Sequence, residues 1–389
     1  MSIYLDNSAT TPVREEVIEV MLASLRDGWG NASSIHSVGR AAAKALKKAR
    51  GQVAALLHCE PEEVYFSSGG TMSNNVTLLG RARFAEANGQ GRHLITTRIE
   101  HPSVLGPTQY LESQGWKVTY LPVDRQGFIS REVLEKSCTK ETSIISVMWA
   151  NNEIGTLQDL QAIATFASER GIFVHTDAVQ VPGKLPIDMQ SMPLSALSLS
   201  GHKFYAPKGI GILFLRRQNN VMPVVFGGGQ EMGLFPGTEG LANIAAIGKA
   251  AELAEQEQLR NIDHLRKMAR ILDDALLSVP GMKVSGATDH SKRLPGHCSY
   301  YLPSVEGESL VMRADLKGVC ISSGSACHKG IIEASTVMRA LNLSDEDAMG
   351  AIRVTAGRFT TEEECSKAAQ ILVDVFKTAK KQEAAASAS

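Results

Sequence analysis

Short apolar runs alternate with helical patterns along the first half of this chain. The runs are rich in valine and isoleucine, and several are followed by Gly, Asn, Asp or His. They occupy residues 64–67, 93–97, 117–123, 142–149, 172–176, 194–199 and 210–215. Between them lie stretches with apolar residues at helical spacing, such as 160–170. This alternation predicts an α/β fold with a mostly parallel sheet covered by helices on both faces. In such a sheet, ligands bind beyond the carboxyl ends of the strands.

The pattern changes near residue 240 and predicts a second, smaller α+β domain. A long helical pattern at 243–279 is closed by Pro280 and Gly281. Shorter runs and helical patterns follow at 282–285, 298–302, 308–314, 319–322 and 362–381. The predicted organisation is an N-terminal arm (1–15), a large domain (16–250), a small C-terminal domain (251–381) and a disordered tail (382–389). We expect the first two helical patterns, near 13–27 and 36–57, to pack on the small domain.

Charge and composition narrow the class of protein. The 40 Lys and Arg residues against 41 Asp and Glu leave a net charge of −1, which removes the electrostatic reason to expect binding to nucleic acid or to a membrane surface. No apolar run approaches the roughly 18 residues of a membrane-spanning helix. The start, MSIYLDNSATTP, lacks the apolar core of a signal peptide. The six cysteines include no CxxC pair, so neither a disulfide framework nor a metal site is indicated. We therefore expect a cytoplasmic enzyme.

A lysine follows one of the apolar runs within a polar cluster. The motif SGHK occupies residues 200–203. Lys203 is expected at the carboxyl end of the sheet, where burial lowers the pKa of a lysine and favours Schiff-base chemistry. Ser200 and His202 beside it suit a phosphate group. Lys208, five residues further on, is the rival, although its place in a turn is more typical of a surface or phosphate-side residue.

An aspartate ends another apolar run. The motif HTDAVQ occupies residues 175–180, and Asp177 in that position is a helix cap, a metal ligand or the partner of a pyridinium nitrogen. Pyridoxal 5'-phosphate needs such an acid to keep its ring nitrogen protonated. Because Asp177 and Lys203 follow two separate strands, the pair favours this cofactor. Gln180 is then placed to hydrogen-bond the phenolic oxygen of the cofactor.

Three further turns after predicted strands carry candidate ligand contacts. The motif SSGGT at 67–71 opens a helix, so Gly70 and Thr71 are placed to offer N–H groups to an anion; an ordinary capped turn has the same pattern. His101 either stacks on a cofactor ring or is a histidine near a turn. Asn152 either binds a substrate carboxylate or the cofactor, or supports its loop.

The most distinctive stretch is SSGSACHKG at 322–330. Cys327 lies among Gly and Ser and is followed by a histidine and a lysine, a polar and electropositive setting that favours a thiolate. We interpret it as a nucleophilic or sulfur-carrying cysteine, with metal ligation as the alternative. Further on, Arg353 and Arg358 each offer a guanidinium group that can bind an amino-acid carboxylate, unless both are surface residues.

Taken together, these motifs resemble those of the cysteine desulfurases, which belong to the fold-type I pyridoxal-phosphate enzymes. The likeness runs from YLDNSATTP (4–12) to RFTTEEE (358–364) and includes NEIG, HTDAVQ, SGHK, PKGIG and SSGSAC in order. The SSGSAC stretch is similar to that of the group with a long, mobile catalytic loop. This resemblance covers nearly the whole chain.

The resemblance implies an enzyme that removes sulfur from L-cysteine, releases L-alanine and carries the sulfur as a persulfide on Cys327. It implies catalytic roles for Lys203, as the Schiff-base lysine, and for His101, in ring stacking and proton transfer. It implies cofactor contacts from Gly70, Thr71, His101, Asn152, Asp177, Gln180, Ser200, His202 and Lys203, with Thr238 of the partner subunit of a homodimer. It also implies substrate binding by Asn152 and Arg353, and a sulfur-acceptor protein. The pathway that receives the sulfur, such as iron–sulfur cluster assembly, stays open.

One segment departs from the family pattern. The family reads QERGLRSGT where this chain reads QEMGLFPGT, within 230–238. Met232 and Phe235 replace two arginines and Pro236 replaces a serine, whereas Thr238 is kept. Two alternatives therefore remain: another fold-type I enzyme (an aminotransferase, a β-lyase or a selenocysteine lyase), or a weakly active homologue that needs a partner protein.

Overall fold

A seven-stranded sheet forms the centre of the larger part of the molecule. The computed structural model describes residues 2–324, 326–328 and 331–386, with the backbone alone described at 326–328, 331–333, 384 and 386. The strands lie in the order β2-β8-β7-β6-β5-β3-β4. They are β2 (Val64–Ser67), β3 (His93–Thr97), β4 (Lys117–Leu121), β5 (Thr142–Ser146), β6 (Phe173–Asp177), β7 (Ala196–Ser200) and β8 (Gly211–Leu215). Strand β8 runs opposite to the rest of the sheet. The predicted runs and the mostly parallel α/β sheet are confirmed.

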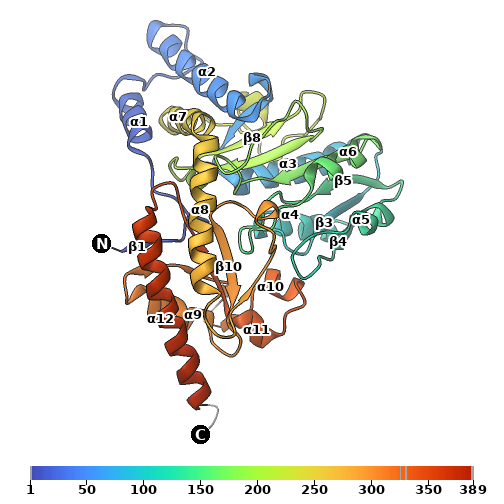
Figure 1. Cartoon of the computed structure of the whole chain (residues 1–389). Helices are drawn as coiled ribbons and strands as arrows, with labels where there is room; N and C mark the ends of the chain where they lie inside the picture. Colours follow the sequence, from blue (N-terminus) through green and yellow to red (C-terminus); the bar gives the residue numbers. More distant parts are fainter. Residues whose placement is uncertain (1, 325, 329–330, 387–389) are drawn as a thin grey trace.

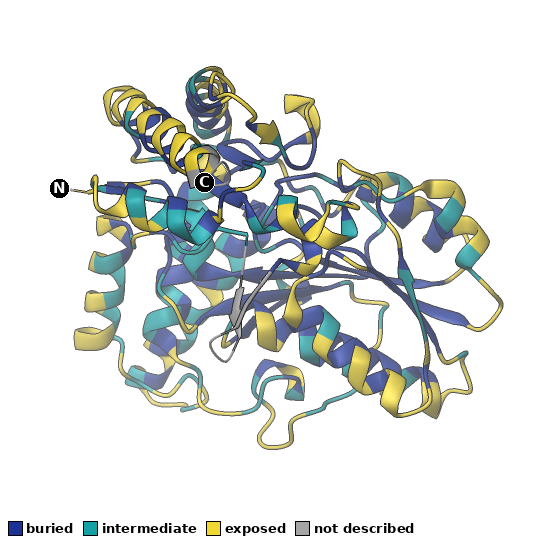
Figure 2. Ribbon diagram, turned by 90° about the horizontal axis from the view of Figure 1, so that it is seen from below, coloured by how far each residue is buried: buried dark blue, intermediate teal, exposed yellow. Residues whose placement is uncertain are grey.

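Helices cover both faces of this sheet. They include α3 (Gly70–Ala87), α4 (Pro102–Ser113), α5 (Arg131–Ser137), α6 (Leu160–Ser168) and α7 (Leu241–Gln256). Figure 2 shows the buried strands between helices whose outer sides are exposed. Because both faces are covered, all of these strands except β4 are buried along their length, and polar side chains within them, such as His175 and Ser198, are hydrogen-bonded to each other. This arrangement leaves the ends of the strands as the part of the sheet open to ligands.

The two N-terminal helices pack on the large part of the molecule. Helices α1 (Glu15–Asp27) and α2 (Ser37–Leu57) lie against α7, as Figure 1 shows, and Val17, Val53 and Leu57 join the core of the large sheet. The expectation that they pack on the small domain is therefore wrong. The two small residues Ala49 and Gly248 allow α2 and α7 to approach closely, since a Cβ added at Gly248 would lie 2.7 Å from the Ala49 Cα.

A four-stranded antiparallel sheet forms the second, smaller part. Its strand order is β12-β15-β10-β9. The strands are β9 (Lys283–Val284), β10 (His297–Tyr301), β12 (Ser322–Ser323) and β15 (Ala351–Thr355), and the helices around them are α8 (Gln258–Leu276), α9 (Gly307–Asp315), α10 (Thr336–Ala340), α11 (Asp345–Met349) and α12 (Glu362–Ala386). Two short pairs complete it, β1 (Ile3–Tyr4) with β11 (Val319–Cys320) and β13 (Ala326–His328) with β14 (Ile331–Glu333). The 3-10 helices of the chain are η1 (Pro61–Glu63), η2 (Gly201–Lys203), η3 (Gln230–Gly233) and η4 (His290–Lys292).

Two helices differ from the sequence pattern. The long helical pattern at 243–279 is divided at Glu257 into α7 and α8, and α8 runs down beside α12. Glu257 is held at this break by ion pairs with Arg14 and Arg358. The predicted disorder from 382 onward is wrong as far as Ala386, because α12 continues to that residue; alanine has a high helix propensity. Residues 387–389 lie outside the described part.

The segment 5–11 joins the two parts of the molecule. Leu5 accepts a hydrogen bond from the Thr355 backbone N–H at 2.7 Å, which ties the segment to β15. Thr11 donates its backbone N–H to the carbonyl oxygen of His202 at 2.9 Å, which ties it to the end of β7. The segment therefore crosses the carboxyl edge of the large sheet.

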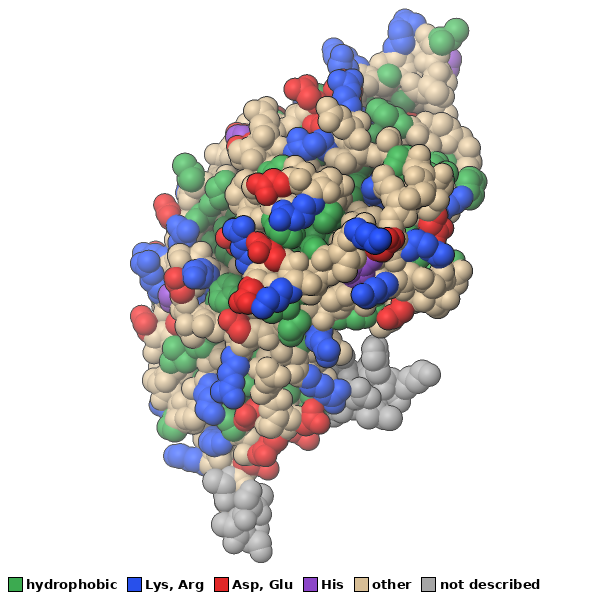
Figure 3. All heavy atoms as spheres, turned by 90° about the vertical axis from the view of Figure 1, so that its right-hand side faces the viewer, with side chains coloured by type: hydrophobic (Ala, Val, Ile, Leu, Met, Phe, Trp, Pro, Cys, Tyr) green, Lys and Arg blue, Asp and Glu red, His purple; other side chains and the backbone are tan. Residues whose placement is uncertain are grey.

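Acidic and basic side chains are intermixed on the surface. Figure 3 shows one face on which Lys and Arg alternate with Asp and Glu, in keeping with the net charge of −1. Across the described part of the chain, none of the helices combines the length and the apolar character needed to cross a membrane.

Candidate active site

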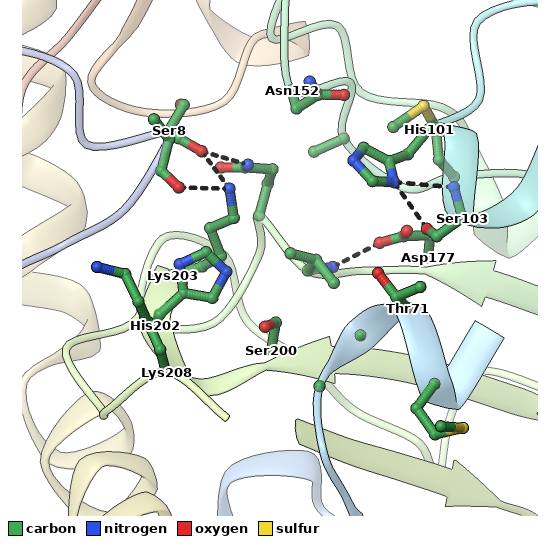
Figure 4. Close-up of a pocket in the computed structure, with 18 of the residues that line it drawn as sticks. Ser8, Thr71, His101, Ser103, Asn152, Asp177, Ser200, His202, Lys203 and Lys208 are labelled. Carbon is green, nitrogen blue, oxygen red and sulfur yellow. Dashed lines mark hydrogen bonds between the residues drawn. The ribbon is translucent and has the colours of Figure 1, made fainter. Parts of the chain in front are cut away.

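A cavity of about 550 Å³ opens at the carboxyl ends of β6 and β7. The N-terminal segment and β15 supply its other side, so residues far apart in the sequence meet there. Residues predicted from the sequence that line it are Gly70, Thr71, His101, Asn152, Asp177, Gln180, Ser200, His202, Lys203 and Arg353. Figure 4 shows Lys203, His202 and Ser8 on one side of the central space, with His101, Asp177 and Thr71 across from them.

Lys203 follows β7 in the short helix η2. Its Nζ donates hydrogen bonds to the carbonyl oxygens of Ser8, at 2.6 Å, and Ala9, at 2.9 Å. Burial lowers the pKa of Lys203 to about 8, and the charge of Arg353 acts in the same direction. Lys208 also lines the cavity but is exposed. Lys203 is therefore the buried lysine of the two, and its lowered pKa makes its neutral amine accessible near neutral pH.

Asp177 is the last residue of β6 and is buried. Its Oδ1 accepts the backbone N–H of Val179 at 3.0 Å, and its Oδ2 accepts a hydrogen bond from Asn74 Nδ2 at 2.8 Å. No helix begins here in the described chain, so the helix-cap interpretation does not hold. A carboxylate in this position, across the cavity from Lys203, can accept a hydrogen bond from a protonated ring nitrogen.

His101 is the residue that caps the N-terminus of α4. Its Nδ1 accepts the backbone N–H of Ser103 at 3.1 Å and lies 2.7 Å from the Ser103 Oγ. Burial lowers the pKa of His101, the charge of Asp177 raises it, and that of Lys203 lowers it. The ring therefore faces the cavity in its neutral form.

The turn from β2 into α3 forms the end of the cavity suited to an anion. Gly69 has a φ of 151°, in the region that favours glycine. A Cβ on Gly70 would lie 2.7 Å from Val179 Cγ2 and 3.4 Å from Ser200 Cβ, so only glycine lets the helix approach β7. The N-terminus of α3, together with Thr71 at its first turn, then offers N–H groups to a phosphate.

Arg353 of β15 forms the opposite end of the cavity. Its Nη1 donates to the carbonyl oxygen of Asn152 at 2.9 Å, and its Nη2 pairs with Asp6 Oδ1 at 2.8 Å. Arg358 instead pairs with Glu257 and lines a separate small cavity. Of the two candidate arginines, only Arg353 lines the main cavity.

Gln180 makes the cavity suitable for pyridoxal phosphate. Its Nε2 donates one hydrogen to the Ser8 carbonyl oxygen at 3.0 Å and has a second N–H that a phenolic oxygen could accept, whereas its buried Oε1 has no hydrogen-bond partner among the described residues. An amine, a carboxylate, a side-chain amide and a helix N-terminus then surround one space. This set of groups matches the aldehyde, ring nitrogen, phenolic oxygen and phosphate of the cofactor.

Of the remaining predicted residues, Thr238 does not line the main cavity and Cys327 is described by its backbone alone. Thr238 lies before α7 and lines a neighbouring cavity of about 280 Å³ with Phe235 and Pro236. Met232 is 66% exposed. The backbone of Cys327 lies in β13, which pairs with β14 as a hairpin, and its side chain lies outside the described part of the structure.

Several residues of the site were missed by the sequence interpretation. They are Asp6, Ser8, Ala9, Asn74 and Ser103. Ser8 and Ala9 act through backbone carbonyl oxygens, which leave no side-chain signal. The motif DNSAT before any long element was the one available hint, because a polar segment without its own helix or strand is often part of a site.

The chain is similar to known proteins over almost its full length. Residues 3–367 match the family described as aminotransferase class-V. A cysteine desulfurase IscS from Dictyoglomus turgidum is 41% identical over 95% of this chain and 93% of the relative. One from Neisseria meningitidis is 42% identical over 95% and 91%. Among solved structures, a NifS-like protein (33% identical) covers 97% of this chain and 100% of its own, with a TM-score of 0.90. SspA in complex with cysteine (32%) covers 93% and 100%, with a TM-score of 0.78.

Proposed function

The chain belongs to the aminotransferase class-V family, and from that membership we propose that it is a pyridoxal-phosphate-dependent cysteine desulfurase. The observation that supports this most directly is the pairing of Lys203 and Asp177 across one cavity, at the ends of the adjacent strands β7 and β6. The substrate is L-cysteine, the product is L-alanine, and Cys327 receives the sulfur as a persulfide.

Some residues of the cavity would hold the cofactor, and others would move protons. The Asp177 carboxylate and the N-terminus of α3 would hold the ring nitrogen and the phosphate, with Ser200 and His202 beside the phosphate. Bound pyridoxal phosphate supplies an electron sink for the α-carbon of an amino acid. Lys203, with a pKa of about 8, can both accept and return a proton near neutral pH.

Arg353 and Asn152 are proposed to hold the substrate. The Nη atoms of Arg353 keep N–H groups beyond their bonds to Asp6 and to the Asn152 carbonyl oxygen. A carboxylate suits such a planar, charged group. The amino acid is then held at the end of the cavity away from α3.

Product analysis of the purified enzyme tests this function. With L-cysteine and a reductant, we expect alanine and sulfide in equal amounts; without the reductant, we expect a persulfide on the protein. Cys327→Ser should abolish the persulfide and keep the visible absorbance of the cofactor. Cys320→Ser is a matched control, because Cys320 is another thiol nearby in the sequence and lies beside Asp315.

Other products would point to other enzymes of the same fold. Formation of pyruvate or another keto acid in place of alanine would indicate a β-lyase or an aminotransferase, and turnover restricted to selenocysteine would indicate a selenocysteine lyase. Activity that appears only after addition of a second protein would indicate the weakly active homologue. Native turnover by Cys327→Ser would remove the persulfide role from that residue.

We also propose that the enzyme is a homodimer that delivers sulfur to an acceptor protein in the cytoplasm. Thr238 lies outside the main cavity of its own chain, and apolar side chains are exposed in the same segment, with Phe226 75% and Met232 66% exposed. In the dimer, Thr238 of the partner subunit would contact the phosphate. Light scattering should give twice the chain mass, and Phe226→Asp should lower it; a monomeric active enzyme would oppose the proposal.

A further inference from the structure

A series of hydrogen bonds joins Asp177 to His101 through two buried residues. Asn74 Nδ2 donates to Asp177 Oδ2 at 2.8 Å and to Ser103 Oγ at 2.9 Å. The same Ser103 Oγ lies 2.7 Å from His101 Nδ1. Asn74 is fully buried, and Ser103 and Asp177 are nearly so. Figure 4 shows His101, Ser103 and Asp177 together on one wall of the cavity. Neither Asn74 nor Ser103 was among the residues predicted from the sequence.

The chemistry of each group fixes the direction of these hydrogen bonds. The Asn74 side chain must present its N–H₂ group to the Asp177 carboxylate, because its carbonyl oxygen would be repelled there. The second hydrogen of that N–H₂ group points to Ser103 Oγ, which therefore accepts. The Ser103 hydroxyl proton is then directed at the remaining neighbour, His101 Nδ1.

His101 Nδ1 thus receives two donors from one residue. The Ser103 hydroxyl is the first, and the Ser103 backbone N–H, at 3.1 Å, is the second. The backbone bond exists because His101 caps α4 and Ser103 is the second residue of that helix. The ring nitrogen has one lone pair, and because both donors point at it, that lone pair carries no proton.

We propose that Ser103, oriented by Asn74, is a positioning residue that holds His101 in the tautomer with its proton on Nε2. Nε2 makes no hydrogen bond with any described residue, and the ring lines the cavity. His101 therefore presents a neutral N–H donor to whatever binds there. The inference deepens the proposed function, since it rests on His101 being part of that site.

The charges around His101 come from two other elements. Asp177 at the end of β6 raises the pKa of His101, Lys203 in η2 lowers it, and burial lowers it most. The Ser103 hydroxyl acts in the same direction as burial, because it must turn away before Nδ1 can be protonated. Removing that hydroxyl leaves both charges in place, so a change in the titration of His101 reports on this contact.

Nitrogen-15 NMR of the holoenzyme, with labelled histidine and His101→Gln for assignment, measures the tautomer directly. In the wild type we expect Nδ1 as an unprotonated acceptor and Nε2 protonated. Ser103→Ala should raise the pKa of His101 by about one pH unit, since one hydrogen bond contributes roughly the free energy of that shift. Ser103→Thr keeps the hydroxyl and should restore the wild-type titration.

Two further variants complete the test. Thr108→Val removes another buried hydroxyl of α4, one that donates to the carbonyl oxygens of Val104 and Leu105, and should leave the His101 titration unchanged. Asn74→Leu frees the Ser103 hydroxyl to rotate and should shift His101 in the same direction as Ser103→Ala.

A protonated Nδ1 in the wild type would overturn the proposal. So would an unchanged His101 titration in a folded Ser103→Ala enzyme, or an equal shift in Thr108→Val. The NMR result does not depend on turnover. If the wild-type enzyme released no sulfur from L-cysteine, the proposed function would be wrong. The tautomer of His101 would still be decided separately by its NMR spectrum.

Discussion

Replacement of Arg353 by glutamine is expected to weaken the binding of L-cysteine far more than it slows the chemistry. Two of the three guanidinium nitrogens are already held, Nη1 by the Asn152 carbonyl oxygen and Nη2 by Asp6. The buried Nε has no partner among the described residues. Each Nη atom keeps one further N–H group, so the arginine can offer a carboxylate one or two charged hydrogen bonds.

The size of the effect follows from that count. A hydrogen bond between charged groups contributes about 1.5–3 kcal/mol, and about 1.4 kcal/mol corresponds to a tenfold change in binding. Loss of one such bond therefore predicts a rise in KM of roughly 10- to 150-fold. Arg353→Lys keeps the charge without the planar group, so its KM should lie between those of the wild type and Arg353→Gln.

Initial rates of alanine formation over a range of L-cysteine concentrations measure this effect. Arg358→Gln is the matched control, because Arg358 pairs with Glu257, and its KM should stay near the wild-type value. Cysteamine, which has the thiol and amine of cysteine without the carboxylate, should bind the wild type and Arg353→Gln equally. A KM for L-cysteine within twofold of the wild type in Arg353→Gln would refute the reasoning.

Three more predictions concern two buried titratable side chains and one glycine in close contact with its neighbours. Burial raises the pKa of Glu100 to about 8, so the wild type should lose stability relative to Glu100→Gln as pH rises from 5 to 8, as measured by urea unfolding. Burial lowers the pKa of Lys184 to about 7, so the wild type should lose stability relative to Lys184→Met as pH falls from 10 to 7. Gly70→Ala should weaken cofactor binding in a spectroscopic titration, because the added Cβ would lie 2.7 Å from Val179 Cγ2. Gly106→Ala, with open space around the added Cβ, is its control.

The two pH predictions have opposite signs for one physical reason. Burial disfavours the charged form of each group, which for Glu100 is the form at high pH and for Lys184 the form at low pH. Parallel stability profiles for either variant and the wild type would show that the group titrates normally in the folded enzyme. Equal cofactor affinities in Gly70→Ala and Gly106→Ala would show that the close contact at α3 does not matter.

The large sheet was predictable because its physical cause is local. A strand buried on both faces is rich in apolar residues, so the strands of the sheet are visible as runs such as 172–176 or 194–199. Since ligands bind at the carboxyl ends of such strands, the residues after these runs, Asp177 and Lys203, were identified from the sequence alone.

Contacts between distant segments were not predictable in the same way. The packing of α2 on α7 depends on Ala49 meeting Gly248, two small residues whose pairing no periodic pattern records. The ion pair of Arg353 with Asp6 joins the two ends of the chain. From the residues alone, Arg353 and Arg358 were equivalent candidates, and only the family resemblance singled out Arg353.

The sequence by itself therefore determined the strands, their order along the chain and the chemistry-bearing residues at their ends, because burial and turn geometry act on neighbouring residues. Only the tertiary structure decided which groups surround those residues: the backbone carbonyl oxygens of Ser8 and Ala9 on Lys203, and the Asn74 and Ser103 link between Asp177 and His101. Such partners come from segments brought together by the packing of the whole chain, and backbone atoms, which every residue has, leave no mark in the sequence.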